Sequence, residues 1–240
     1  MDTRPSNGII DLVKVGKTYP PNVQALVDVT LNIDRGEMVY LTGMSGAGKT
    51  TLLHLISRVE KADKGVIEVA GIDLTNLPQR KIHLLRRKIG FAFQDFKLLP
   101  ERTVAYNIAL ALEVVYTPAA VIEKRVRELL QQLNLVRKYA TRANELSRGE
   151  QQRVAIARAV ATAPEIILAD EPTGNLDADT TGRVMDLFHR HNQMGATIVI
   201  ATHDRSLYDP ARDRVVELHF GRMRGTPTPE PRAAGPAMEV

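Results

Sequence analysis

Residues 43–50 of the chain, which read GMSGAGKT, constrain its fold more than any other segment. An apolar run at residues 38–42 precedes them, and leucines and an isoleucine at helical spacing follow. This is the order of strand, loop and helix in which the P-loop pattern G-x-x-x-x-G-K-[ST] binds phosphates, because backbone N–H groups then surround the phosphates at a helix N-terminus. The segment therefore predicts an α/β fold that binds a nucleoside triphosphate, in preference to a plain glycine-rich turn.

The P-loop pattern also assigns roles to single side chains. Lys49 would reach the terminal phosphates, and Thr50 would offer its hydroxyl to Mg²⁺. The expected phosphate contacts are Gly43, Ser45, Gly46, Ala47, Gly48, Lys49, Thr50 and Thr51. Kinases, GTPases, helicases and transporter ATPases all use such a loop, so the pattern alone leaves the reaction open.

Length and composition narrow the class of protein. A chain of 240 residues is long enough for one large α/β domain and too short for two complete nucleotide-binding domains, so a second ATP site would require another chain. The net charge of +4 rests on 32 Lys and Arg scattered among 28 Asp and Glu, which is weak evidence for a nucleic-acid or membrane partner. Because the chain has no Cys, it forms neither a disulfide nor a thiolate metal site. No segment resembles a secretory signal or a membrane span, so we expect a soluble chain whose membrane role requires a partner.

The apolar patterns predict how the chain is organised. Strand-like and helix-like segments alternate over most of the sequence, which implies a mostly parallel sheet covered on both faces, whereas helical spacing dominates residues 103–140. We therefore expect a single domain at residues 1–224, with a helical subdomain at about 95–160 inserted in the α/β core. Residues 225–240 are rich in Pro and are expected to form a mobile tail.

A pair of acids, Asp170 and Glu171, follows a wholly apolar run at residues 166–169. Such a run is typical of a buried parallel strand, and ligands bind at the carboxyl ends of these strands. Asp170 would hold Mg²⁺ directly or through water, since a small hard cation prefers oxygen ligands. Glu171 would orient or deprotonate the water that attacks the γ-phosphate. A solvated acidic turn is the plain alternative, which the P-loop in the same chain disfavours.

Three further segments resemble sequence motifs of the nucleotide-binding subunits of ABC-type ATPases. They are residues 146–153, reading LSRGEQQR, residues 169–177, reading ADEPTGNLD, and residues 201–204, reading ATHD. With the P-loop, they complete the motif set of that family in its order, over roughly residues 9–222. The resemblance implies a P-loop NTPase fold with a mostly parallel core sheet, an antiparallel β subdomain and an inserted helical subdomain. It also implies ATP hydrolysis with Mg²⁺.

The resemblance assigns additional site residues. Gln94 matches the glutamine that touches Mg²⁺ and the attacking water, and His203 matches the histidine that contacts the γ-phosphate. Together with Glu171, they are the expected catalytic residues. Tyr19 matches the aromatic residue that stacks on adenine, and Asp177 matches the residue that links two sites across a dimer.

Residues 147–150, which we call the signature loop, match the loop that contacts the γ-phosphate of ATP held by a second subunit. Ser147, Gly149 and Glu150 are the matching residues, so an ATP-dependent homodimer in head-to-tail arrangement is implied. Arg148 departs from the motif, which usually has glycine there. Its side chain is expected to restrict the loop or to add positive charge near phosphate, with an effect on turnover rather than on the fold.

Residues 168–177 resemble the branch of this family that contains lipoprotein-releasing, macrolide-exporting and cell-division systems, but they do not separate its members. Within that branch, the chain resembles the cell-division ATPases most at residues 93–99, 102–104, 149–153 and 188–192 and at Gly195. The resemblance implies an integral membrane partner resembling FtsX, a peripheral location on the cytoplasmic face of the plasma membrane, regulation of cell-wall hydrolysis, and no nucleic-acid partner. An exporter subunit is the alternative, and an ATP-gated scaffold with incidental hydrolysis is a further one. The expected docking surface contains Phe96, Leu98, Leu99 and Tyr106.

Overall fold

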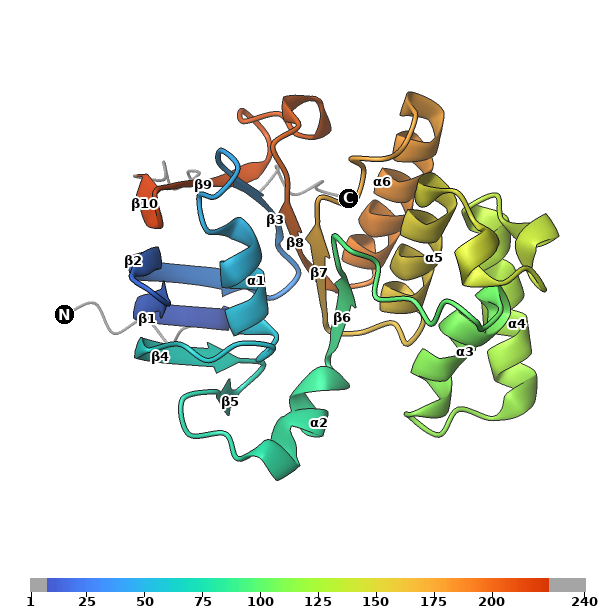
Figure 1. Cartoon of the computed structure of the whole chain (residues 1–240), viewed down its shortest axis with the longest axis horizontal. Coiled ribbons are helices and arrows are strands. Elements are labelled where there is room, and N and C mark those ends of the chain that lie inside the picture. Colours follow the sequence, from blue (N-terminus) through green and yellow to red (C-terminus); the bar gives the residue numbers. More distant parts are fainter. Residues whose placement is uncertain (1–7, 225–240) are drawn as a thin grey trace, which may run out of the picture.

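The computed structural model describes residues 8–224, which form two β-sheets with helices beside them (Figure 1). The expected Pro-rich tail at residues 225–240 lies outside the described residues. Among residues 8–224, none of the helices combines the length and the apolar character needed to cross a membrane.

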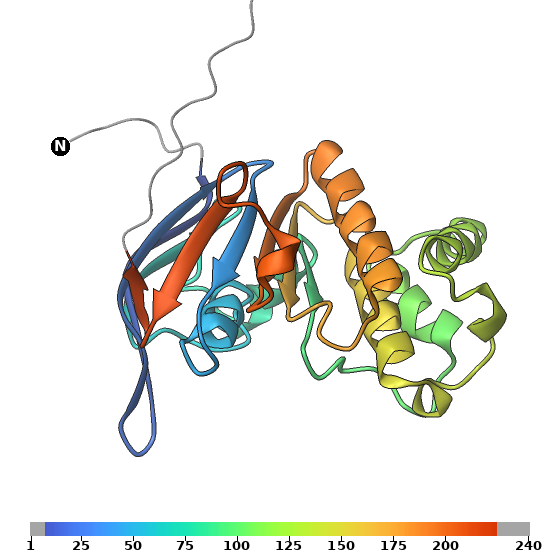
Figure 2. The same ribbon diagram turned by 90° about the horizontal axis from the view of Figure 1, so that it is seen from above.

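The first sheet is antiparallel, with strand order β2-β1-β4-β5. Its strands are β1 (Gly8–Tyr19), β2 (Val23–Asp34), β4 (Lys64–Val69) and β5 (Ile72–Asp73). In β2, the buried Val29, Leu31 and Ile33 alternate with exposed residues, as expected for a strand with one buried face. The hairpin of β1 and β2 protrudes from the molecule at its tip (Figure 2).

The second sheet has strand order β10-β9-β3-β8-β7-β6 and contains the strand that leads into the P-loop. Its strands are β3 (Met38–Thr42), β6 (Ile89–Ala92), β7 (Ile166–Asp170), β8 (Thr197–Ala201), β9 (Arg214–His219) and β10 (Arg222–Arg224). All neighbours in this sheet pair in parallel except β10 with β9. The expected combination of a mostly parallel core sheet and an antiparallel sheet is confirmed.

The central parallel strands are buried on both faces, which explains their unbroken apolar sequences. Ile167 and Ala169 of β7 belong to the core beneath the helices of the second half of the chain. Ile166 and Leu168, on the opposite face, belong to a core shared with the antiparallel sheet and the helix after the P-loop. The polar residues that follow each strand therefore emerge at one edge of the sheet.

Three helices follow one another between β6 and β7: α3 (Val104–Glu113), α4 (Ala119–Gln132) and α5 (Arg148–Val160). The other three are separated along the chain: α1 (Lys49–Ile56) follows β3, α2 (Ile82–Arg86) precedes β6, and α6 (Ala178–Gln193) lies between β7 and β8. Single 3₁₀ turns are η1 (Gln79–Lys81), η2 (Val136–Lys138), η3 (Ala143–Glu145) and η4 (Arg205–Leu207).

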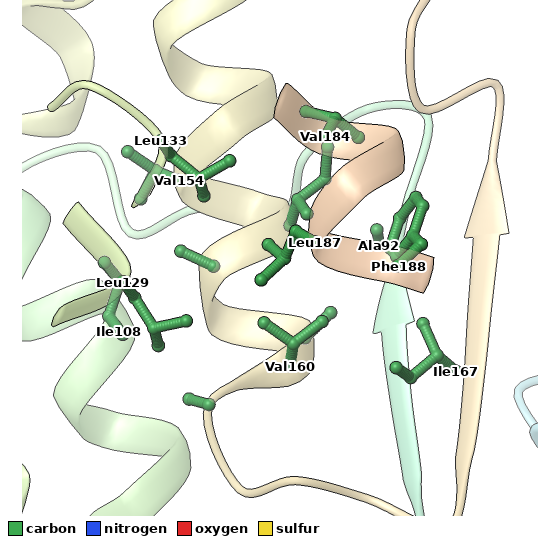
Figure 3. Packing of buried hydrophobic residues seen from close by; sticks show 14 of the residues in the cluster. Ala92, Ile108, Leu129, Leu133, Val154, Val160, Ile167, Val184, Leu187 and Phe188 are labelled. Atoms are coloured by element: carbon green, nitrogen blue, oxygen red, sulfur yellow. The ribbon is translucent and has the colours of Figure 1, made fainter. Parts of the chain in front are cut away.

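Helix α5 connects the sheet to the other helices. In Figure 3, it lies between α6 and the strands on one side and α3 and α4 on the other. The helical apolar spacing predicted over residues 103–140 corresponds to the buried residues Val104, Ile108, Leu112, Val126, Leu129, Leu130 and Leu133. Val121 is exposed, whereas the next residue, Ile122, lies one turn before Val126 and packs against the core.

Candidate functional site

The P-loop connects β3 to α1, and its backbone requires glycine at two positions. Gly43 has φ 142°, and a Cβ there would lie 2.2 Å from the carbonyl oxygen of Leu218. Gly48 has φ 106°, and a Cβ there would lie 2.5 Å from the carbonyl oxygen of Ala25. Both positions combine a left-handed backbone with a close approach of another chain segment, so only glycine fits.

Helix α1 begins at Gly48 without a side-chain hydrogen bond to its first N–H groups. Helix N-termini that lack such a cap leave backbone donors open to an anion, and the helix dipole favours negative charge there. The P-loop therefore presents an anion site of the kind that the sequence predicted.

Lys49 is almost fully buried, at 7% exposure, and its ammonium group is held inside the loop. Its Nζ donates to the carbonyl oxygens of Gly43, at 2.7 Å, and Met44, at 3.2 Å. The same nitrogen lies 3.9 Å from Oε1 of Glu171. These contacts fix a positive charge between the P-loop and the acidic end of β7.

Asp170 ends β7 and is buried, at 2% exposure. Burial raises the pKa of its carboxyl group; a hydrogen bond with the Thr50 side chain opposes the rise, and the neighbouring Glu171 charge adds to it. Its Oδ1 has no hydrogen-bond partner among the described residues. A buried carboxylate oxygen without a partner, next to a threonine hydroxyl, offers the hard oxygen ligands that Mg²⁺ prefers.

Thr50 and Asp170 provide only part of the oxygen ligands that Mg²⁺ needs, and phosphate oxygens would provide others. Within residues 8–224, no group of three or more His, Cys, Asp or Glu side chains is placed to hold a metal ion. Mg²⁺ in nucleotide sites is usually held by one or two protein oxygens together with substrate phosphates and water. Thr50 and Asp170 therefore suit a metal that arrives with the nucleotide.

Glu171 follows Asp170 and has φ 47°, a left-handed conformation that is uncommon for a residue with a side chain. Its N–H donates to the carbonyl oxygen of Ala201 at 2.9 Å, which ties it to the end of β8. Its Oε1 lies 2.8 Å from Nδ1 of His203, which follows the same strand. An ionised carboxylate only accepts hydrogen bonds, so the His203 ring donates from Nδ1. The pair fixes the direction of the Glu171 carboxylate.

These groups line one open cavity with a volume of about 1110 Å³. Of the expected site residues, the cavity brings together Ser45, Gly46, Ala47, Gly48, Lys49, Thr50, Thr51, Gln94, Asp170, Glu171 and His203. Its wall also contains Gln24, which no motif marks, and Gln151 and Asn175, which lie inside the quoted motifs but were given no role. Phe96, expected on the docking surface, lines the cavity as well.

The expected residues Tyr19, Ser147, Gly149, Glu150 and Asp177 do not line this cavity. Tyr19 lies at the end of β1, paired with Val23, and the Lys17 ammonium lies 5.2 Å from the centre of its ring. Asp177 begins α6, and its Oδ1 accepts from the N–H of Thr180 at 2.8 Å, which lowers the pKa of its carboxyl group. Gly43, another expected residue, is also absent from the lining. The roles of Tyr19 and Asp177 stay predictions.

The signature loop opens α5 with a capping box. The Ser147 hydroxyl oxygen accepts from the N–H of Glu150 at 3.3 Å, and Oε2 of Glu150 accepts from the N–H of Ser147 at 2.9 Å. Burial acts to raise the pKa of Glu150, but its hydrogen bonds with Ser147 and Lys138 lower it overall. The loop is thus rigid without a ligand.

Gly149 is required for a different reason from the P-loop glycines. Its φ is not in the left-handed region, but a Cβ would lie 2.9 Å from the carbonyl oxygen of Asn175. The signature loop therefore touches the segment between Glu171 and Asp177 directly. A change at one segment displaces the other, because the two backbones are in contact at this point.

Comparisons with known proteins agree with this geometry. The ABC transporter family model matches residues 26–174. The cell division ATP-binding protein FtsE of Bacillus subtilis is 45% identical over 213 residues, which cover 89% of this chain and 93% of that protein. FtsE of Escherichia coli K12 is 44% identical over 211 residues, covering 88% and 95%.

Solved structures give the same result. The dimeric structure of the bacterial ABC transporter cassette MJ0796 has a TM-score of 0.85 at 39% identity, covering 90% of this chain and 97% of that one. A dimeric post-hydrolysis state of MJ0796 bound to ADP and Pi has a TM-score of 0.85 at 38% identity, with the same coverage. Family and fold are therefore both confirmed: the chain belongs to the ABC transporter family of ATPases, in its branch of cell division ATP-binding proteins.

Proposed function

We propose that this ATPase of the cell-division branch works as two copies that close head to tail around ATP and Mg²⁺ and move a membrane partner. One observation carries the proposal. The cavity of a single chain contains the P-loop, Glu171 and His203, while Ser147 and Gly149 of the same chain lie outside its lining. A site that needs both sets of residues is complete only when a second copy supplies the signature loop.

The geometry supports hydrolysis by a positioned water. Glu171, oriented by His203 and by the Ala201 carbonyl, accepts a proton from the water as its oxygen attacks the γ-phosphorus. The bond between the γ-phosphorus and the oxygen that bridges to ADP breaks, and ADP leaves with that electron pair. Lys49 offsets the charge on the terminal phosphates, and Gln94, which lines the same cavity, would orient the water.

Thr50, Asp170 and Gln94 would hold Mg²⁺ that enters with the nucleotide. When bound, the ion neutralises charge on the phosphate oxygens. The orphan Oδ1 of Asp170 supports this role, since a buried carboxylate without a partner is otherwise unfavourable.

The proposed closure brings each signature loop to the phosphates on the partner's P-loop. Ser147 keeps its hydroxyl proton available as a donor, because its oxygen serves the capping box only as an acceptor. In the same closed state, Tyr19 would stack on adenine, and Asp177 would connect the two sites. The relatives of known structure that are dimeric support this arrangement.

Replacing Glu171 by Gln tests the enzymatic part. The carboxamide keeps the size of the side chain but cannot take a proton, so hydrolysis should fall by a factor on the order of 10²–10⁴. ATP should then hold the variant as a dimer, seen as a doubled mass by light scattering, while the parent chain with ATP returns to monomer as ATP is consumed. A variant that hydrolyses ATP at the parental rate, or that stays monomeric at saturating ATP, contradicts the proposal.

The membrane partner, which we expect to resemble FtsX, would dock in a groove formed by α2, β6, α3 and α5. Two adjoining hollows of about 530 and 350 Å³ share Arg86, Ile89, Phe91 and Arg158 in their walls. The floor is apolar and the rim is cationic, which fits an amphipathic segment with acidic residues. Docking of this kind would hold the chain at the cytoplasmic face of the plasma membrane, the location that we propose for it.

The groove lies beside, and not on, the docking surface expected from the sequence. Phe96 is buried, while Leu99 and Tyr106 are exposed but line neither hollow. Arg158 connects the groove with the loop after Gln94, because its guanidinium donates to the carbonyl oxygens of Phe96 and Lys97, both at 2.7 Å. A segment that pushes on Arg158 therefore acts on the loop that follows Gln94.

Charge reversal at the rim tests the docking site. Arg86→Glu should lower the recruitment of the chain to membranes that contain the partner by about tenfold, because like charges then face each other. Arg137→Glu, at an exposed residue outside the groove, is the matched control and should leave recruitment unchanged. Equal recruitment of both variants contradicts the groove as the docking site.

The relatives favour division over export, since those found at 44–45% identity are cell division ATP-binding proteins. An ATP-gated scaffold, in contrast, would need closure but no hydrolysis. Cells that carry only the Glu171→Gln chain distinguish the two. A division defect supports a hydrolysis-driven function, and normal division supports the scaffold.

A further inference from the structure

Arg148, the first residue of α5, is an exposed cation to which the reaction above gives no role. It lines the nucleotide cavity, at the signature-loop side of its wall. Within residues 8–224, its guanidinium takes part in no hydrogen bond or ion pair, whereas its neighbours Ser147 and Glu150 are both engaged in the capping box. The loop is therefore fixed while the Arg148 side chain is free to reach a ligand.

The fold tolerates a side chain at position 148, although the motif usually has glycine there. Arg148 has no left-handed backbone conformation, and it occupies an ordinary first helical position. Gly149, one residue later, has the carbonyl oxygen of Asn175 only 2.9 Å from where a Cβ would lie. Within this loop, packing against the rest of the chain therefore restricts the residue at position 149 and not the one at 148. The Arg148 side chain is free to contact a ligand or a second copy.

The positive charge of Arg148 does not help to stabilise α5, so it is available for another role. A cation in the first turn of a helix is mildly unfavourable, because the helix dipole is positive at that end. The cavity wall, meanwhile, carries three acids, Asp95, Asp170 and Glu171, against the permanent cations Lys49 and Arg148. A triphosphate bound in this cavity is repelled by the acids of its wall, so each additional cation that contacts the phosphates stabilises the bound nucleotide.

We propose that Arg148 contacts the phosphates of ATP bound to the P-loop of a second copy, and so stabilises the closed dimer. The inference rests on the proposed head-to-tail dimer and adds a charge-assisted contact in trans to the one expected from Ser147. In a symmetric dimer, each composite site gains one guanidinium from its partner. Arg148 also borders the cavity of its own chain, so a contact in cis is the competing outcome that the experiment separates from the proposed contact in trans.

The experiment measures ATP-driven dimerisation in the Glu171→Gln background, which excludes hydrolysis. Arg148→Ala, Arg148→Lys and the control Arg137→Ala are each combined with it, and dimerisation is followed by analytical ultracentrifugation over a range of ATP concentrations. Removing one charge-assisted contact should weaken dimerisation by about tenfold for each composite site. Arg148→Lys should recover part of the loss, and Arg137→Ala should match the parent.

ATP affinity at protein concentrations below dimerisation separates trans from cis action. Arg148→Ala should leave this affinity, and the melting temperature without nucleotide, at the parental values. Unchanged dimerisation of Arg148→Ala overturns the proposal, as does a loss of ATP affinity in the isolated chain, which would place the contact in cis. If the Glu171→Gln chain with Arg148 intact fails to dimerise, the proposed dimer itself is wrong, and the role of Arg148 fails with it.

Discussion

The P-loop and the signature loop each lead into a helix, but the two helices begin in opposite ways. Helix α1 starts at Gly48 with no side-chain cap, so its first N–H groups are open to an anion. Helix α5 starts at Ser147 with a complete capping box. The first loop is thus a phosphate site in its own right. Among side-chain donors, the second offers a ligand only the Ser147 hydroxyl proton and the Arg148 guanidinium.

In the proposed function, this contrast explains how one chain would bind a nucleotide and yet need a second copy to hydrolyse it. The P-loop side also contains Lys49, Asp170, Glu171 and His203, held by contacts with each other or with Thr50. The signature side is held in shape by Glu150, Lys138 and the Asn175 backbone, none of which requires a ligand. Changes on the two sides should therefore separate binding from closure.

Among changes that separate the two loops, Lys49→Ala is expected to have the largest effect. It removes the buried ammonium group and leaves the Gly43 and Met44 carbonyls without that donor. Hydrolysis should fall by a factor on the order of 10²–10³, since one preorganised charge on the phosphates is lost. ATP affinity of the isolated chain, measured by equilibrium dialysis, should fall as well. Parental affinity in this variant would contradict the view that the P-loop side binds alone.

Gly149→Ala should have the opposite effect: it should impair dimerisation and leave nucleotide binding by the isolated chain intact. The new Cβ would lie 2.9 Å from the Asn175 carbonyl oxygen, so the signature loop must shift, at about 1–3 kcal/mol of unfolding free energy. ATP affinity of the isolated chain should stay parental, while ATP-driven dimerisation and hydrolysis are lost.

Gly182→Ala is the matched control for that variant. Gly182 lies in α6, and a Cβ there would have no atom within 4 Å outside the backbone of its own helix, so alanine should raise the unfolding free energy by up to about 1 kcal/mol. Dimerisation should not change. If Gly149→Ala dimerises as well as Gly182→Ala does, the signature loop has no part in closure.

A smaller effect on folding, with a definite sign, is expected for Asp170→Asn. Burial raises the pKa of Asp170 in the folded chain above its unfolded value. Such a group stabilises the fold at low pH, and this stabilisation is lost as the pH rises through the folded-state pKa. The Asn variant should therefore melt at or above the parental temperature at neutral pH, with no advantage in acid, although it hydrolyses little ATP. A clearly lower melting temperature at neutral pH would contradict the unfavourable burial of this charge.

The smallest expected effect on nucleotide binding is that of a change at His191, the buried one of the two histidines in α6. Burial, with the nearby Arg125 and Arg190 charges, lowers the pKa of His191 to about 4. A depressed histidine pKa means that stability present above about pH 6.5 is lost as the pH falls towards 4, by up to roughly 3 kcal/mol. Urea unfolding between pH 7 and 4.5 should show this loss in the parent and less of it in His191→Gln, while ATP affinity at pH 7 is the same in both. An equal loss in both chains would contradict the assignment.

The P-loop pattern predicted the role of Lys49, and the apolar run before Asp170 and Glu171 predicted their place at the carboxyl end of a parallel strand. His203 was assigned by the family resemblance. Strands β3, β7 and β8 are neighbours in one sheet, so their carboxyl ends meet at one edge. Apolar spacing likewise located the buried faces of α3 and α4. Such inferences need only the direction and order of strands, which local pattern and family resemblance provide.

Contacts between loops could not be predicted in the same way. Spacing did not indicate that Asn175 approaches Gly149, that Arg158 donates to the loop after Gln94, or that Phe96 is buried. Either Val121 or Ile122 could begin the apolar stripe of α4 from sequence alone, and only Ile122 packs against the core. Gln152 is fully buried with both side-chain polar atoms unpaired among the described residues, and no pattern in the sequence anticipates it.

Cross-linking tests the central claim, closure of a P-loop on the signature loop of another copy, most directly. The chain has no Cys, so Met44→Cys beside the P-loop and Glu145→Cys beside the signature loop, both at exposed positions, introduce the only thiols. The two chains, each with Glu171→Gln, carry tags of different size and are mixed with a short bis-maleimide. A cross-linked mixed dimer should form with ATP and Mg²⁺ and be absent without ATP. Cross-links between two Met44→Cys chains at the same yield, or no dependence on ATP, would contradict the account.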